Sequence, residues 1–411
     1  MLMKSTMRPS LLLSLLVLQI PPVDGRDFEG TPAVAWSYKA TGPIETAAAL
    51  TQDHAFFATE SKQIFALHRA SGKLAWSFRA RGECMASGVT GAGAFFAGCD
   101  DGILHAFEQA TGNERWSHNA GGEFTGGAAF SARHGTVIVG SSKPSVLALD
   151  ARTGEVKWKF TGRTLKTVSS TPVLDAEEAF VYVGDDGGRF YKLHADTGAV
   201  AWEKELEADN NEWNVRCAAN VLDDVVLVSA GDPDHPPPYG SVFALSTVDG
   251  KERWRSDCAG GPNKCSSCWT TPEIVDGVVV LGCGIDGEPS GKAWGMQPAT
   301  GKLLWQRDFP HDIQTSAPLA LPDGKAFVTG CLDGNLYCLE AKTGEVRWKW
   351  GTKGGKGIWS TPRLAIDKRE STGAGEESTL DATIYVSSHD RHVYALRDTI
   401  SSAASGGRSE L

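Results

Sequence analysis

Nine cysteines are the residues of this 411-residue chain whose spacing points most directly to chemistry. Cys84 and Cys99 are 15 residues apart, and Cys268 and Cys283 have the same separation. Neighbouring antiparallel strands bring such residues within reach of a disulfide bond when both side chains lie on the same face. We therefore predict one disulfide in each pair.

A further group of cysteines surrounds a loop that contains Gly and Pro. Cys258 and Cys265 flank this loop and could close it as a disulfide. Cys265 and Cys268 also have the spacing of zinc ligands, and Cys258 and Cys283 could complete a tetrahedral thiolate site. We expect disulfides and no metal, with buried free thiols and a zinc site as the alternatives. The odd number of cysteines leaves at least one outside any internal pair.

Three glutamates lie shortly after tryptophans that recur along the chain. Glu83 and Glu123 each lie seven residues after a Trp, and Glu45 lies nine residues after another. We interpret them as an acidic arc on a rim, which could bind a planar anion or a peptide segment together with aromatic and basic side chains. The alternative is a set of solvated strand ends without a ligand. The aromatic and basic candidates opposite the arc are Trp213, Arg216, Trp269, Trp359 and Arg363.

The sequence His389-Asp390-Arg391-His392 contains paired histidines, which suggest a metal site. It aligns, however, with Cys99-Asp100-Asp101-Gly102, where the residue types are those of a hairpin turn. We therefore predict a turn at 389–392.

An internal repeat must position all of these residues. A segment of 13 residues ending in Trp occurs seven times, at 64–76, 104–116, 146–158, 190–202, 242–254, 293–305 and 336–348. A Gly after Thr, Ser or Asp marks a tight turn in each copy. Such a period of about 40 to 50 residues indicates a propeller, a solenoid or an array. The recurrent tryptophans are Trp36, Trp76, Trp116, Trp158, Trp202, Trp254, Trp305 and Trp348.

An eighth copy is split between the two ends of the chain. Residues 393–398 supply its first strand, and residues 33–42 supply its Trp strand. A last repeat that is completed by the first strand closes a ring and removes the exposed sheet edges. We therefore predict an all-β fold, an eight-bladed β-propeller of four-stranded antiparallel blades, closed by the N-terminal strand. Each Trp should wedge between blades and donate its N–H to a backbone acceptor.

The repeated pattern Ala-x-Asp-x-x-Thr-Gly-x-x-x-Trp resembles the tryptophan-docking motif of the pyrroloquinoline-quinone (PQQ)-like repeat family over about residues 33–398. The resemblance implies a propeller, but the fold serves quinoprotein dehydrogenases, a lipoprotein of bacterial outer-membrane protein assembly and catalytically silent scaffolds. The dehydrogenases typically hold PQQ between a Trp and a disulfide of two adjacent cysteines, with a bound calcium. This sequence has no Cys-Cys pair and no carboxylates with calcium-loop spacing.

These observations favour a non-catalytic binding or scaffold module for a protein or peptide partner, without a cofactor. The rim and the longer loops at 232–240 and 258–268, in the fifth and sixth blades, are the expected contact surfaces. The alternative is a PQQ- and calcium-dependent oxidoreductase that acts on an alcohol or a sugar. The net charge of −10 and the lack of a basic stripe argue against nucleic acid as a partner. The sequence does not define an oligomeric state.

Both ends of the chain lie outside the repeats. Lys4 and Arg8 precede an apolar run at 11–20 that is too short to span a membrane, so residues 1–25 are predicted to be a signal peptide. Export would place the protein in a secreted, periplasmic or endoplasmic-reticulum compartment. The ending Arg408-Ser409-Glu410-Leu411 weakly resembles a retrieval signal of the endoplasmic reticulum. Residues 399–411 are predicted to be a flexible tail, and residues 368–381 a polar loop.

Overall fold

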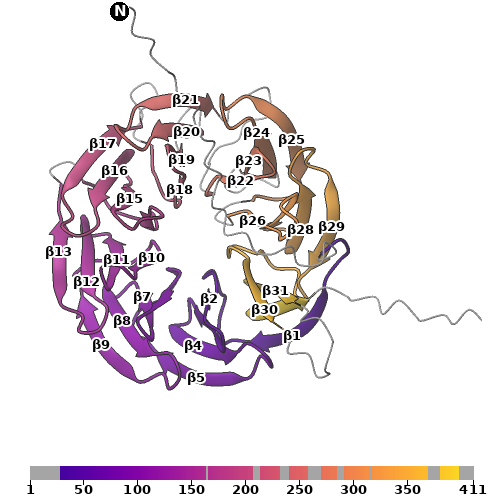
Figure 1. Ribbon diagram of the computed structural model, residues 1–411. Helices are drawn as coiled ribbons and strands as arrows, with labels where there is room; N and C mark the ends of the chain where they lie inside the picture. Colours follow the sequence, from indigo (N-terminus) through magenta and orange to yellow (C-terminus); the bar gives the residue numbers. More distant parts are fainter. Residues whose placement is uncertain are drawn as a thin grey trace, which may run out of the picture.

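The computed structural model confirms a closed ring of eight four-stranded antiparallel sheets (Figure 1). The structure describes residues 28–162, 165–206, 213–231, 240–257, 270–284, 291–313, 317–368 and 380–397. The signal-peptide and tail predictions, the two loops in the fifth and sixth blades and most of the polar loop fall outside these residues. Within the described part of the chain, no helix is long and apolar enough to cross a membrane.

Within each blade, the strands run in order from the innermost, next to the axis, to the outermost (Figure 1). Blade 1 contains β2 (Ala49–Leu50), β3 (His54–Ala58), β4 (Gln63–His68) and β5 (Leu74–Arg79). Blade 2 contains β6 (Val89–Gly91), β7 (Ala94–Gly98), β8 (Ile103–Glu108) and β9 (Glu114–Asn119). Blade 3 contains β10 (Ala128–Ser131), β11 (Thr136–Ser141), β12 (Ser145–Asp150) and β13 (Val156–Phe160). Blade 4 contains β14 (Val173–Leu174), β15 (Phe180–Gly184), β16 (Arg189–His194) and β17 (Val200–Glu205).

The remaining blades continue around the ring. Blade 5 contains β18 (Asn220–Val221), β19 (Val225–Gly231), β20 (Gly240–Ser246) and β21 (Glu252–Asp257). Blade 6 contains β22 (Glu273–Val275), β23 (Val278–Gly284), β24 (Gly291–Met296) and β25 (Leu303–Phe309). Blade 7 contains β26 (Leu319–Ala320), β27 (Ala326–Gly330), β28 (Asn335–Glu340) and β29 (Val346–Gly351). Blade 8 contains β30 (Arg363–Lys368), β31 (Leu380–Ser387), β32 (His392–Arg397) and, outermost, β1 (Ala33–Lys39).

The middle strands of each blade carry the core, because they are covered on both faces by the neighbouring blades. In β7 every residue is buried, whereas the outermost strand β13 exposes Val156 and Lys157 and buries Trp158. A continuous apolar run is the pattern of a strand covered on both faces, and alternation is that of a strand covered on one. The core therefore forms one apolar layer between each pair of adjacent blades.

The recurrent tryptophans connect one blade to the next. The indole N–H of Trp158, for example, donates to the backbone oxygen of Ala195 at 2.9 Å. A turn glycine of the next blade lies against the ring of every recurrent tryptophan except Trp348. A Cβ at Gly198, whose φ is +70°, would approach the Trp158 ring to 2.5 Å. Only Gly combines that backbone conformation with such close contact. Equivalent N–H bonds join Trp36, Trp76, Trp116, Trp202, Trp254 and Trp305 to residues 69, 109, 151, 247, 298 and 341.

Ring closure involves two contacts of the N-terminal segment. β1 lies on the outer side of blade 8, where the two ends of the ring meet (Figure 1). It pairs with β32 in antiparallel register, from Ala33 opposite Arg397 to Lys39 opposite His392. In addition, the indole N–H of Trp348 donates to the backbone oxygen of Phe28 at 2.7 Å. Phe28 is fully buried in the cluster between blades 7 and 8. The split eighth repeat predicted the strand pairing, but the Phe28 contact lies beyond the repeat and was not predicted.

Candidate functional site

One rim of the propeller is built from two kinds of segment. We call the turn between the second and third strands of a blade its rim turn, and the segment that enters a blade from the preceding one its linker. The linker into blade 2 illustrates the arrangement: Cys84 N–H donates to Thr59 O in the rim turn of blade 1, and Glu83 O accepts from Asp100 N–H in the rim turn of blade 2. This linker therefore touches the rim turns of both blades that it joins.

Three carboxylates gather around the rim turn of blade 2. Glu83 belongs to the linker that enters this blade, Glu123 to the linker that leaves it, and Asp100 lies in the turn between them. Burial of the Asp100 carboxyl group, together with the charges of Glu123, Glu83 and Asp101, raises the pKa of Asp100 to about 6. Its Oδ1 atom is buried without a hydrogen-bond partner in the structure. The acidic arc at this turn therefore consists of Glu83, Asp100 and Glu123, whereas Glu45, the third glutamate predicted for it, lies in the linker into blade 1.

Substitution of Asp100 by Asn should stabilise the protein at neutral pH. Because folding raises the pKa of Asp100, the stability due to its protonated form is complete below about pH 4 and is lost as the pH rises through about 6. At pH 7.5, Asp100→Asn should therefore have a free energy of unfolding higher than that of the wild type by on the order of 1 kcal/mol, after allowance for solvent screening. The difference should vanish near pH 4. Thermal melts at both pH values test this, with the exposed Glu252→Gln as control; equal melting at pH 7.5 would contradict it.

A second cluster lies at the junction of blades 8 and 1. Glu45 is in the linker into blade 1, Glu60 is in the rim turn of blade 1, and His389 is in the rim turn of blade 8. His389 Nε2 lies 2.9 Å from Glu45 Oε1 and 3.4 Å from Glu60 Oε1. The Trp359 ring stacks on the His389 ring, with 5.6 Å between centroids. Burial raises the pKa of Glu60, and the nearby carboxylates of Glu45 and Glu83 raise it further. His389 acts in the opposite direction.

The four residues 389–392 include the predicted turn between β31 and β32. Arg391 N–H donates to Ser388 O at 3.1 Å, and Arg391 has a positive φ of 72°. The two histidines diverge, since His389 meets Glu45 and Glu60 whereas His392 Nδ1 lies 3.4 Å from Asp390 Oδ1. A metal held by both histidines is therefore not supported.

The aromatic and basic candidates of the rim have different environments. Arg216 lies in the linker into blade 5, and its Nε is 3.4 Å from Asp186 Oδ1 in the rim turn of blade 4. Burial raises the pKa of Asp186, although Arg216 and Ser169 act in the opposite direction. Arg363 is exposed at the start of the inner strand β30, yet surrounding protein lowers its pKa by desolvation.

The prediction that Trp213 lines the rim is wrong. Its side chain is fully buried among Phe190, Val215 and Phe243, between blades 4 and 5. The large ring fills this apolar space, and the guanidinium of Arg255 covers it at 4.9 Å. A ligand at the rim could not reach it. Trp269 lies outside the described residues.

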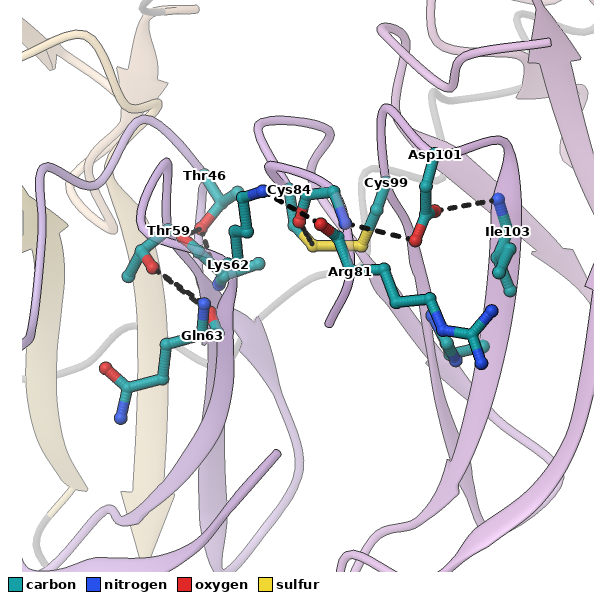
Figure 2. The surroundings of a disulfide bond; sticks show 12 residues. Thr46, Thr59, Lys62, Gln63, Arg81, Cys84, Cys99, Asp101 and Ile103 are labelled. Atoms are coloured by element: carbon teal, nitrogen blue, oxygen red, sulfur yellow. Dashed lines mark hydrogen bonds between the residues drawn. A yellow bond between two sulfur atoms is a disulfide. The ribbon is translucent and has the colours of Figure 1, made fainter. Parts of the chain in front are cut away.

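Cys84 and Cys99 are joined by a disulfide in the structure (Figure 2). Both side chains are fully buried, and the bond ties the linker into blade 2 to the rim turn of the same blade. Asp101 supports the same junction, because its carboxylate accepts from Gly82 N–H at 3.1 Å and Ile103 N–H at 3.0 Å. The disulfide thus adjoins the acidic arc in the chain, since Cys84 follows Glu83 and Cys99 precedes Asp100.

The other cysteines fall into two groups. Cys283 is disulfide-bonded, and its predicted partner Cys268 lies outside the described residues, as do Cys258 and Cys265. Cys283 is therefore not available as the fourth thiolate of a zinc site. The described cysteines with free thiols are buried, and burial raises the pKa of each; they are Cys217, Cys331 and Cys338.

Comparison with known proteins assigns the class of this propeller. The family model described as outer membrane protein assembly factor BamB matches residues 100–256, 161–317 and 295–398. The chain therefore belongs to this family of PQQ-like repeat propellers.

Individual relatives are of two kinds. The chain is 27% identical over 187 residues to the outer membrane protein assembly factor BamB of Burkholderia pseudomallei (strain K96243), covering 45% of this chain and 43% of the relative. It is 27% identical over 128 residues to the quinohemoprotein alcohol dehydrogenase ADH IIB of Pseudomonas putida, covering 29% of this chain and 18% of the relative. The matches thus span less than half the length of these two curated relatives.

Solved structures show the same fold. BamB from Moraxella catarrhalis superposes with a TM-score of 0.67 at 18% identity, covering 89% of this chain and 99% of that one. The quinohemoprotein alcohol dehydrogenase from Comamonas testosteroni gives a TM-score of 0.67 at 16% identity, covering 89% of this chain and 76% of that one. At these identities the likeness concerns the fold alone.

Proposed function

We propose that this chain is a non-catalytic propeller that binds a segment of a partner protein at its rim, in an exported compartment. The acidic arc of Glu83, Asp100 and Glu123 carries the proposal, because its three carboxylates gather at one rim turn, where burial, and after it repulsion from Glu123 and Glu83, raises the pKa of Asp100. A partner segment with Lys or Arg would relieve this repulsion, and a charged rim increases the rate of such an encounter. The predicted signal peptide and the Cys84–Cys99 disulfide support an oxidising, exported location.

The described residues do not fit the cofactor arrangement that the resemblance to quinoprotein dehydrogenases implies. The sequence has no adjacent cysteines, and the Cys84–Cys99 disulfide is fully buried below the rim, so it cannot contact a planar group on the axis. Trp359 is stacked on His389 at the junction of blades 8 and 1. No catalytic step is derived through PQQ for this chain.

Addition of PQQ and Ca²⁺ should therefore produce no dehydrogenase activity. The full-length protein, incubated with both and with an artificial electron acceptor, should leave the acceptor oxidised when alcohols or sugars are added. Dye reduction monitored by absorbance measures this, and a known quinoprotein dehydrogenase is the positive control. Substrate-dependent turnover would establish the alternative function, an oxidoreductase.

Binding at the arc is tested with matched peptides. An Arg-rich 12-residue peptide should bind more tightly than a Glu-rich one, and Glu83→Gln with Glu123→Gln should weaken the Arg-rich peptide about tenfold. The control variant combines Glu155→Gln with Glu252→Gln, two exposed residues on the outer side of the blades, and changes the net charge equally. Fluorescence anisotropy at 150 mM salt reports the affinities, since longer-range attraction is screened there. Equal weakening in both variants would contradict binding at the arc.

A further inference from the structure

The loops that meet at the ring closure contain a set of potential metal ligands. Glu45 follows β1, the strand that closes the ring, Glu60 lies in the rim turn of blade 1, and His389 lies in the rim turn of blade 8. One atom of each, Oε1, Oε1 and a ring nitrogen, lies within 4.8 Å of the other two. Two carboxylates and an imidazole are ligands that divalent first-row metals accept.

The separations between these atoms suit a common metal ion. His389 Nε2 is 2.9 Å from Glu45 Oε1 and 3.4 Å from Glu60 Oε1. Two ligand atoms bound about 2.1 Å from one ion at octahedral or tetrahedral angles are about 3.0 to 3.4 Å apart. The two distances from His389 Nε2 therefore match the separation of neighbouring ligand atoms around one metal ion.

The protein also holds the ligands in place without a metal. Backbone bonds join the three loops: His389 N–H donates to Gly357 O at 3.1 Å, Glu60 N–H to Pro43 O at 3.2 Å and Ile44 N–H to Ser388 O at 3.4 Å. The stacked Trp359 ring fixes the plane of His389. The three side chains are 28%, 29% and 30% exposed, so solvent can deliver an ion and supply water as a further ligand.

A simple hydrogen-bonded pair accounts for only part of this arrangement. One proton on His389 Nε2 can make one good bond, yet two carboxylate oxygens approach the same nitrogen. A divalent cation would satisfy both carboxylates and the imidazole together. We propose that Glu45, Glu60 and His389 bind one divalent metal ion of the Zn²⁺ or Mn²⁺ type, which clasps blade 8 to blade 1 at the ring closure.

This site shares no residue with the acidic arc, although the charge of Glu83 acts on Glu60, and it does not rest on the peptide-binding proposal. Its effect is structural, because the ion would link a residue next to the closing strand to the rim turns of the first and last blades. Metal binding to the folded state alone raises its stability. The ion should therefore raise the melting temperature of the ring.

Titration of the full-length protein with metal tests the proposal. After dialysis against EDTA, the wild type should bind one equivalent of Mn²⁺ or Co²⁺ in calorimetry and melt at a higher temperature with the metal. His389→Ala and Glu60→Gln should each weaken binding at least tenfold and remove the metal-dependent rise. His392→Ala is the matched control, because this neighbouring histidine contacts Asp390 and lies outside the cluster.

The same titration tests whether cysteine thiolates bind the metal instead. Cys265→Ser combined with Cys268→Ser should leave the binding unchanged, and the Co²⁺ complex should lack thiolate charge-transfer absorption. The proposal would be overturned by an absence of binding to the wild type, by equal binding to His389→Ala, or by a Co²⁺ spectrum with thiolate ligands.

Discussion

A chain that begins at Ile44 should melt roughly 10 °C below the full-length protein. The truncation removes β1, so β32 loses its partner strand and blade 8 loses its outer layer. It also removes Trp36, whose N–H bonds Arg69 O at 2.8 Å, and the buried Phe28. Loss of two large aromatic side chains from packed sites costs about 3 to 5 kcal/mol each. In a domain of this size, such a loss of stability lowers the melting temperature by roughly 10 °C.

Single substitutions separate the two closing contacts. Phe28→Ala should lower the melting temperature while β1 remains paired, because it empties a site between blades 7 and 8. Trp36→Phe should cost about 1 kcal/mol, the value of one hydrogen bond. Lys39→Ala, at an exposed position of the same strand, is the control and should have little effect. Scanning calorimetry measures the full-length protein, the truncated chain and the three variants. If the truncated chain melted with the full-length one, closure by the N-terminal segment would be wrong.

Removal of the Cys84–Cys99 disulfide should have the next largest effect. A crosslink that closes a loop of 15 residues is worth about 3 kcal/mol in the chain-entropy estimate. The double variant Cys84→Ala with Cys99→Ala should therefore show a free energy of unfolding lower by about that amount in urea. The loosened linker would also release the neighbouring Glu83 and Asp100 from their fixed separation.

Cys338→Ala is the control for the loss of a buried sulfur, because Cys338 is free and fully buried. It should destabilise the protein less than the double variant. A reducing agent should lower the stability of the wild type by more than that of the double variant, which keeps the disulfide of Cys283. Mass spectrometry of the unreduced, alkylated protein gives a direct count, in which Cys84 and Cys99 should remain unmodified. Modification of all nine cysteines would remove the disulfides and weaken the case for export.

The features that could be predicted from sequence are those that recur. Seven copies of one segment define the blades, and the two halves of the eighth identify β1 as the closing strand, because a repeat without its Trp strand must obtain one elsewhere. Glu83 and Glu123 could be paired because each follows its Trp at the same distance. In the structure they flank the same rim turn.

The features that could not be predicted depend on residues that meet only after the ring closes. Asp100 and Glu60 look like ordinary turn residues, and their pKa values are raised first by burial and then by carboxylates in neighbouring linkers. Trp213 occupies a linker like the rim residues, but no spacing shows that its ring turns into the core. Phe28 precedes the first repeat, so nothing in the pattern marks its bond with Trp348.

Hydrogen–deuterium exchange of a peptide complex tests most directly whether the rim is the partner-binding surface. The peptide would be selected from a random display library on the full-length protein, without any bias in charge. We predict that it carries Lys or Arg and that it protects backbone amides near 83–87, 99–102 and 123–127. Protection confined to the outer strands, or the same protection pattern and affinity with Glu83→Gln and Glu123→Gln, would contradict the account.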